Sequence, residues 1–167
     1  FETIFDKNNK NRIIVATFAP NVDRVQQIIN AAVSHGRKIA VEGRSMVNII
    51  TTANELGYIN IPDNLLIDID MIKNYPPEKV VLITTGSQGE AMAALSRMAG
   101  GIHKKVSIMP GDTVILSSSP IPGNEKLIGN ILNEMYKKGV SVFHDQDVVA
   151  FHGLIQILEE FDLTGRY

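Results

Sequence analysis

Residues 80–95 read VVLITTGSQGEAMAAL, an apolar run that passes through two glycines into an alanine-rich segment. The β-branched and aliphatic residues at 80–84 predict a buried strand, and residues 91–98 predict a helix. The glycines and hydroxyl side chains between them lie where this strand is expected to turn into the helix. A strand followed directly by a helix is the repeating unit of a parallel sheet, so this stretch decides the fold class if the unit recurs.

The same unit recurs along the chain. Near-continuously apolar strands that alternate with helices are typical of a parallel sheet covered on both faces. With right-handed crossovers, the sequence predicts an α/β, Rossmann-like three-layer sandwich, with a mostly parallel sheet and helices on both faces. The predicted strands are 13–18, 38–42, 65–69, 80–84, 113–116 and 140–143, and the predicted helices are 22–33, 46–56, 91–98, 127–135 and 154–161.

The composition is that of a folded domain. The 167 residues are 44% hydrophobic and 20% charged, and the apolar runs are far shorter than the ~20 residues that cross a bilayer. The absence of cysteine excludes disulfides and fits a reducing cytoplasm, so we expect one cytoplasmic domain without membrane contact. The chain begins FETIFDKNNKN, without a methionine or a signal core, and is expected to be a fragment or a processed product. A net charge of −2 means that any polyanion must be bound by local loops and backbone donors.

Ligands bind parallel sheets outside the carboxyl ends of the strands, so the loops that follow strands are informative. The loops at 18–21, 42–45, 84–90 and 117–124 are rich in Gly, Ser, Thr, Asn or Pro, and we expect them along one edge. In the third loop, the S-x-x-E spacing indicates a helix capping box, while free N–H groups at a helix start attract phosphate. These two interpretations are compatible, and both stay open. Neither the dinucleotide fingerprint nor the P-loop pattern is present.

The loops at 42–45 and 117–124 each have a structural and a ligand-binding interpretation. Ser45 is expected to cap a helix that begins at Met46, and Arg44 is either a solvated charge or a bidentate clamp for a phosphate. Residues 117–124 read SSSPIPGN, whose prolines make a rigid loop that either starts the next helix or holds a ligand.

Residue chemistry alone predicts no catalytic residue and no metal ligand. His35, His103, His144 and His152 fall in no H-x-H, H-E-x-x-H or HxHxDH pattern, so local spacing does not assemble a metal site. His35 precedes Gly36 and is expected at a helix C-terminus, where a cationic side chain is favourable. A cysteine nucleophile and a G-x-S-x-G elbow are both absent from the sequence.

Several segments together, in this order, resemble a known family. The segments RIIVATFAPNVDRVQQIINAA, GRKIAVEGRSM, ELGYI, TTGSQGEAMAALSRMA and PGDTVILSSSPIPGNE are similar to the β-CASP domain of bacterial ribonuclease J, a metallo-β-lactamase-fold nuclease. The resemblance covers residues 1–148 and is most specific in TGSQGE and SSSPIPGN. It implies a single β-CASP-type domain over residues 1–167 with a divergent tail at 149–167, which is a divergent natural end, a truncation or a junction with foreign sequence.

The resemblance implies a role in RNA cleavage. In that family, a metallo-β-lactamase domain holds two metal ions, zinc or manganese, which activate water for phosphodiester hydrolysis, and single-stranded RNA lies between the domains. The implied parent protein is a 5′-exonuclease and endonuclease of RNA processing and decay, and a homo-oligomer. This chain lacks the HxHxDH ligands, so we expect it to hold no cofactor and to be inactive when isolated.

The RNA-binding residues that the resemblance implies lie on three loops. The family continues with an H-x-S-G-H segment where this chain reads VVAFHG at 148–153, so His152 is the expected active-site remnant and 5′-phosphate recognition is not carried over. Two alternatives stay open: a stand-alone Rossmann-like domain that binds a nucleotide or another small phosphorylated ligand, and an interaction module without ligand affinity. The implied RNA-binding residues are Arg44, Ser45, Thr85, Gly86, Ser87, Gln88, Gly89, Glu90, Ser117, Ser118, Ser119, Pro120 and Asn124.

Overall fold

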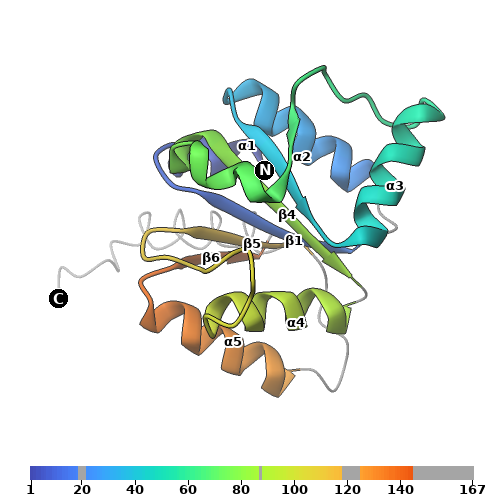
Figure 1. Ribbon diagram of the computed structural model, residues 1–167. Helices are drawn as coiled ribbons and strands as arrows, with labels where there is room; N and C mark the ends of the chain where they lie inside the picture. Colours follow the sequence, from blue (N-terminus) through green and yellow to red (C-terminus); the bar gives the residue numbers. More distant parts are fainter. Residues whose placement is uncertain (19–21, 87, 118–124, 145–167) are drawn as a thin grey trace, which may run out of the picture.

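A six-stranded parallel sheet runs through the middle of the molecule in the computed structural model, which describes residues 1–18, 22–86, 88–117 and 125–144 (Figure 1). The strand order is β3-β2-β4-β1-β5-β6, and each neighbouring pair is parallel. The predicted α/β class is therefore confirmed. The strands are β1 (Ile13–Phe18), β2 (Lys38–Glu42), β3 (Leu66–Ile67), β4 (Val80–Gly86), β5 (Thr113–Ser117) and β6 (Ser141–His144).

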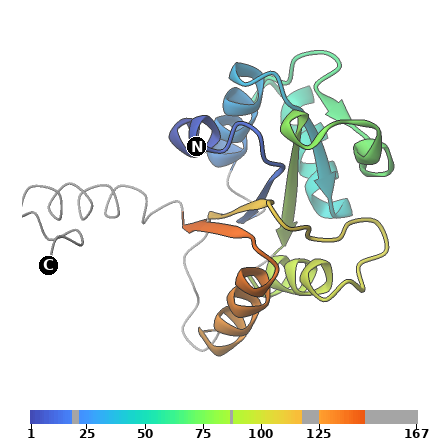
Figure 2. The same cartoon turned by 90° about the vertical axis from the view of Figure 1, so that its left-hand side faces the viewer.

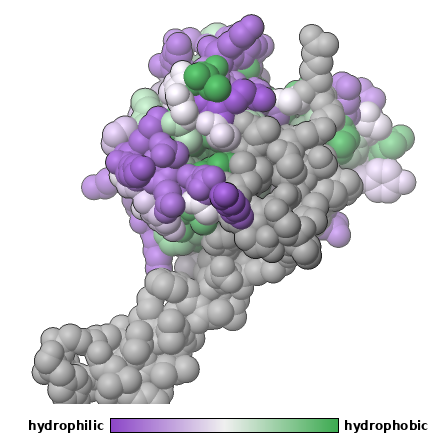
Figure 3. Space-filling model, turned by 90° about the horizontal axis from the view of Figure 1, so that it is seen from below, coloured by the Kyte–Doolittle hydropathy of each residue, from purple (hydrophilic) through white to green (hydrophobic). Residues whose placement is uncertain are grey.

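Helices cover both faces of this sheet. Figures 1 and 2 show α1, α2 and α3 on one side and α4 and α5 on the other. Seen from the side of α4 and α5, the coloured part of the surface is mostly hydrophilic with small hydrophobic patches (Figure 3). The helices are α1 (Glu2–Lys7), α2 (Val22–Ser34), α3 (Arg44–Glu55), α4 (Gln88–Ala99) and α5 (Glu125–Lys137), with 3₁₀ helices η1 (Ile69–Asn74) and η2 (Pro77–Lys79).

The core consists of two hydrophobic clusters, one on each face of the sheet. Successive strand residues point to opposite faces, so Ile14 and Leu82 join the cluster beneath α4 and α5, whereas Val15 and Ile83 join the cluster beneath α2 and α3. All four side chains are fully buried. Burial on both faces is why these strands read as continuous apolar runs rather than as alternating ones.

The strand limits predicted from the sequence agree best with the structure in the buried centre of the sheet. The predictions at 13–18 and 38–42 match β1 and β2 residue for residue, while the strand expected at 65–69 is reduced to β3. That strand stops because the Asp68 carboxylate accepts a hydrogen bond from the backbone N–H of Asp70 at 2.9 Å and starts η1. The short helix α1 was not predicted, and the helix expected at 154–161 lies outside the described residues.

The amino edge of the sheet is closed by a buried ion pair. Arg12, which precedes β1, donates from Nε and Nη2 to the two carboxylate oxygens of Asp112, at 3.1 and 2.6 Å. Its Nη2 also donates to the carbonyl of Ser107 at 2.7 Å. Because Asp112 directly precedes β5, this bidentate contact fixes the starts of two neighbouring strands relative to each other.

A second arginine closes the same edge without a carboxylate. Arg37 is only 2% exposed and donates to the carbonyls of Asn11, Asn8 and Val80 at 2.7, 3.0 and 3.1 Å. Burial desolvates this guanidinium and lowers the pKa of Arg37 from its ordinary value. The carbonyls come from the chain before β1 and from the start of β4, so the Arg37 side chain joins three segments at one point.

His35 follows the last residue of α2, as the sequence predicts, and also contacts α1. Its Nδ1 lies 2.8 Å from the carbonyl oxygen of Ala31, and its Nε2 lies 2.6 Å from Oδ1 of Asp6. The hydrogen bond to Asp6, then the one to Ala31, raises the pKa of His35 above its ordinary value, although partial burial opposes this. The imidazole therefore joins the end of α2 to α1, and its protonated form is favoured at this position.

We expect the contribution of His35 to stability to depend on pH. A folded-state pKa raised above the unfolded value means that the stabilisation is complete below pH 6.5 and is lost as pH rises through the folded pKa. His35→Gln should lower the free energy of unfolding by about 0.5 kcal/mol at acidic pH, and by less in alkaline buffer. Urea titrations at several pH values measure this difference. Asp6→Asn should reduce the pH dependence, because it removes the largest cause of the raised pKa, and a difference that grows with pH would contradict the assignment.

Candidate functional site

The carboxyl ends of four strands lie at one edge of the sheet. In the strand register, Glu42 of β2 pairs with Thr84 of β4, and Thr17 of β1 pairs with both Thr85 of β4 and Ser117 of β5. The chain therefore leaves β2, β4, β1 and β5 at neighbouring positions. This is the edge at which ligands of parallel α/β sheets bind.

The described members of the predicted RNA-binding set share this edge. Arg44 and Ser45 open α3, Thr85 and Gly86 end β4, and Ser117 is the last residue of β5 and is 7% exposed. Three further members, Gln88, Gly89 and Glu90, are the first residues of α4. The remaining predicted residues, Ser87, Ser118, Ser119, Pro120, Asn124 and His152, lie outside the described residues. The backbone positions therefore converge, while the role in RNA binding stays a prediction.

The helix cap that the sequence predicts at Ser45 is wrong. Helix α3 begins at Arg44, and its N-cap is Gly43, whose side-chain-free backbone adopts φ 107°. This conformation favours glycine and lets the chain turn from β2 into α3 without a polar cap. Ser45 consequently lies inside the first turn, and Arg44 is the first helical residue after the strand end.

Two buried hydroxyl groups lie just beneath this edge. Thr17 is 1% exposed and Thr84 is 0% exposed, and neither Oγ1 has a hydrogen-bond partner among the described residues. By the two-residue alternation of strands, Thr84 shares a face with Leu82 and Thr17 shares the opposite face with Val15. A buried hydroxyl without a partner costs stability, so the core is not optimised for stability where it meets the loops.

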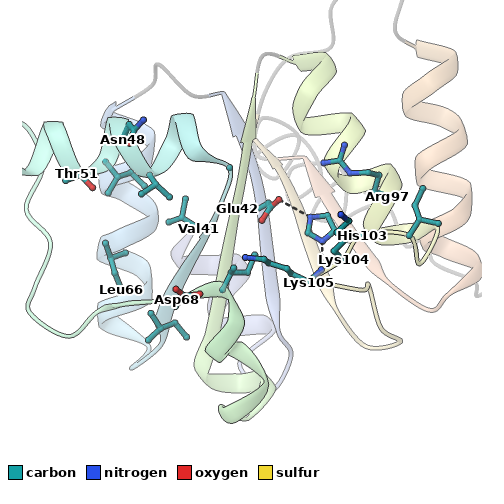
Figure 4. Close-up of a pocket in the computed structure, with 16 residues that line it drawn as sticks. Val41, Glu42, Asn48, Thr51, Leu66, Asp68, Arg97, His103, Lys104 and Lys105 are labelled. Atoms are coloured by element: carbon teal, nitrogen blue, oxygen red, sulfur yellow. Dashed lines mark hydrogen bonds and ion pairs between the residues drawn. The ribbon is translucent and has the colours of Figure 1, made fainter.

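A cleft of about 890 Å³ opens beside this edge. Its walls are α3, the ends of β2 and β3, the end of α4 and the segment that follows α4 (Figure 4). Asn48 and Thr51 project from the α3 side, and Arg97, His103 and Lys104 from the other. The complete lining is Val41, Glu42, Gly43, Val47, Asn48, Ile50, Thr51, Leu66, Ile67, Asp68, Ile69, Arg97, Ile102, His103, Lys104 and Lys105.

His103 joins the segment after α4 to the end of β2. Its Nδ1 accepts hydrogen bonds from the backbone N–H groups of Lys105 and Val106, at 3.2 and 3.1 Å. The proton of the neutral ring is therefore on Nε2, which donates to Oε1 of Glu42 at 2.9 Å (Figure 4). With side chains 6% and 22% exposed, His103 and Glu42 form a largely sheltered contact inside the cleft.

The cationic side chains of the cleft differ in their partners. Lys105 lies 3.5 Å from the carboxylate of Asp70, in a pair with both side chains at least half exposed. Arg97 and Lys104 are exposed, and neither side chain has a hydrogen bond or ion pair within the described part of the chain. The sequence reasoning did not single out these residues. The available signal was GGIHKK at 100–105, in which adjacent cations follow the glycines that end a helix.

The described residues do not fit a metal centre. Across residues 1–18, 22–86, 88–117 and 125–144, His, Cys, Asp and Glu side chains do not form a group of three that could hold a metal ion. The expectation that this chain itself holds no metal stays a prediction. In the same ranges, every helix is too short or too polar to cross a membrane.

Comparison with known proteins identifies relatives of this chain. Residues 10–135 match the family described as "Ribonuclease J, beta-CASP domain". Ribonuclease J of Mycolicibacterium smegmatis is 52% identical over 133 residues, which are 80% of this chain and 24% of the relative. Ribonuclease J2 of Bacillus subtilis is 44% identical over 146 residues, 87% of this chain and 26% of the relative. Ribonuclease J 1 of Streptococcus pyogenes is 51% identical over 133 residues, 80% of this chain and 24% of the relative.

This chain thus spans about a quarter of the length of these curated relatives. Among solved structures, a de novo designed protein with a P-loop NTPase fold aligns with a TM-score of 0.37 at 10% identity, over 94% of this chain and 98% of that one.

The partnerless hydroxyl of Thr84 yields a stability prediction. Thr84→Val replaces a buried hydroxyl without a partner by a methyl group, so the free energy of unfolding should rise by about 1 kcal/mol. The matched control is Thr113→Val. Thr113 is equally buried, but its Oγ1 donates to Oδ1 of Asn8 at 3.1 Å, so that substitution should lower stability by about 1 kcal/mol. Denaturant titration of both variants measures the contrast, and equal losses would refute it.

Proposed function

The chain belongs to the β-CASP domain family of ribonuclease J, and we propose that it is the RNA-binding domain of a ribonuclease J-like, metal-dependent ribonuclease. The observation that carries this proposal is the shared strand-end edge. The loops with the sequences EGRS, TTGSQGE and SSSPIPGN all start from it. A single domain over residues 1–167, with a divergent tail at 149–167, is part of the same proposal.

The edge offers the groups that a sugar–phosphate backbone requires. Helices α3 and α4 both begin there, so their free N–H groups and positive dipole ends face the same side as the strand ends. Glycines at 86 and 89 allow close approach of a phosphate chain, and the hydroxyl residues supply further donors. Local donors of this kind allow RNA binding by a chain whose net charge is −2.

The parent protein supplies the chemistry that this chain lacks. Two metal ions, zinc or manganese, in a metallo-β-lactamase domain would activate water for attack on the phosphodiester. The part played by this chain is to hold and orient single-stranded RNA against that domain. We place the parent protein in the cytoplasm, as a homo-oligomer with 5′-exonuclease and endonuclease activity in RNA processing and decay.

The proposal predicts weak, salt-sensitive binding of single-stranded RNA. The Arg44→Ala and Ser118→Ala variants should each bind a labelled oligonucleotide roughly 3- to 10-fold more weakly, as expected for one lost phosphate contact. Fluorescence anisotropy at several salt concentrations measures this. Lys10→Ala is the control, because it removes a charge from an exposed residue before the amino end of β1, away from the loops.

Other outcomes identify the alternatives. Saturable binding of a mononucleotide, independent of RNA length, would favour a small-ligand domain, and no binding at all would favour an interaction module.

We further predict that the purified chain has no nuclease activity when zinc or manganese is added, because the metal ligands are expected on the partner domain. Release of labelled fragments from an RNA oligonucleotide measures this activity. Turnover that persists through repeated purification would contradict the assignment of catalysis to another domain.

A further inference from the structure

The cleft between α3 and the segment after α4 is continuous with the proposed RNA-binding edge. Gly43 lines the cleft, and the next residue, Arg44, opens α3 and belongs to the proposed RNA-binding set. Glu42, the last residue of β2, also lines the cleft and pairs in register with Thr84 of β4. A strand of RNA that contacts the loops after β2 and β4 would therefore reach the mouth of this cleft.

The charges of the cleft favour an anionic occupant. Arg97 and Lys104 are exposed cations without a partner in the described ranges. The acidic groups nearby are engaged: Glu42 accepts from His103, Asp68 accepts from the backbone N–H of Asp70, and Asp70 itself lies 3.5 Å from Lys105. Phosphate is the anionic group that arginine and lysine side chains lining one cleft are best suited to bind.

His103 fixes the position of the segment that carries Lys104. Its ring accepts the backbone N–H groups of Lys105 and Val106 and donates to Glu42, so the segment that carries Lys104 is tied to the end of β2. The contact joins residues that are 61 positions apart in the sequence and is largely sheltered from solvent. His103 is thus a positioning residue, because it acts through the backbone of its neighbours.

The remaining lining suits unstacked nucleotides. Apolar side chains of Val41, Ile67 and Ile102 offer surface to a base, and Asn48 and Thr51 on the facing wall offer hydrogen-bonding groups to base edges or to a 2′-hydroxyl. Single-stranded RNA presents bases and phosphates together, which matches a cleft with both kinds of lining.

We propose that this cleft is an additional subsite for single-stranded RNA, in which Arg97 and Lys104 bind backbone phosphates and His103 positions the segment that carries Lys104. The subsite rests on the proposed function, since it extends the path of RNA beyond the loops at the strand ends. The side chains of Arg97 and Lys104 would add ionic contacts to an edge that otherwise binds RNA through loops and helix N-termini.

The test uses the 167-residue chain and a single-stranded RNA of about 12 nucleotides. Arg97→Gln and Lys104→Gln should each lower the affinity roughly 3- to 10-fold at low salt. Each should also reduce the slope of log affinity against log salt by about 0.7, the value for one phosphate contact on a single strand. Lys10→Gln, an equal change of charge near the amino edge, should change neither quantity by a similar amount.

One substitution in the cleft is expected to raise RNA affinity rather than lower it. Glu42→Gln keeps an oxygen that accepts from His103 but removes the negative charge beside the proposed phosphates, so RNA affinity should rise roughly 2- to 3-fold. A gain in affinity cannot result from misfolding. His103→Ala should lower affinity and the salt slope together, whereas a merely structural role would lower thermal stability and leave the salt slope unchanged.

The outcomes separate this inference from the proposed function. If Arg44→Ala weakens binding while Arg97→Gln and Lys104→Gln bind with the wild-type affinity and salt slope, RNA binding stands and the subsite is overturned. If the wild-type chain binds no RNA at any salt concentration, the proposed function itself fails. If instead a polyglutamate peptide binds the wild-type chain but neither cleft variant, and RNA binding is unaffected, the cleft is a site for acidic peptides and the proposal is wrong.

Discussion

The structure depends on the common direction of its six strands. Because every pair is parallel, all amino ends lie at one edge of the sheet and all carboxyl ends at the other. The amino edge is closed by two buried arginines: Arg12 is neutralised by Asp112, and Arg37 is surrounded by backbone carbonyls. Breaking either contact would leave buried polar groups without partners, so this edge holds the strand register.

The carboxyl edge has the opposite character. There the Oγ1 atoms of Thr17 and Thr84 have no partners among the described residues, and α3 begins at a glycine without a side-chain cap. In the adjoining cleft, the side chains of Arg97 and Lys104 form no ion pair within the described part of the chain. Each of these features costs a little stability or contributes none. A rigid core with a satisfied amino edge can tolerate them, and a ligand that carries phosphates would find donors already in place.

The sequence predicted the sheet well because burial on both faces leaves a simple pattern. Continuous apolar runs identify β1, β2, β4 and β5, and three- and four-residue spacing identifies the helices that cover them. The ends of individual elements were harder to predict, because they depend on single residues. The carboxylate of Asp68 shortens β3, and Gly43, with its backbone freedom, is the N-cap of α3 in place of the expected cap at Ser45. The cleft could not be predicted, since its residues come from segments as far apart as Val41 and Lys105 and share no motif.

The net charge of the chain does not indicate the local charge at either edge of the sheet. Counted over the whole sequence, acids slightly outnumber bases, which argues against a polyanion as ligand. In the fold, however, Arg12 and Asp112 cancel at the amino edge, Lys105 lies beside Asp70, and His103 engages Glu42. The cleft lining still carries three cationic side chains against the two carboxylates of Glu42 and Asp68, and among the described residues Arg97 and Lys104 have no ion pair. Because exposed charges are screened within about 8–10 Å, a bound strand would respond to this local excess of positive charge rather than to the total.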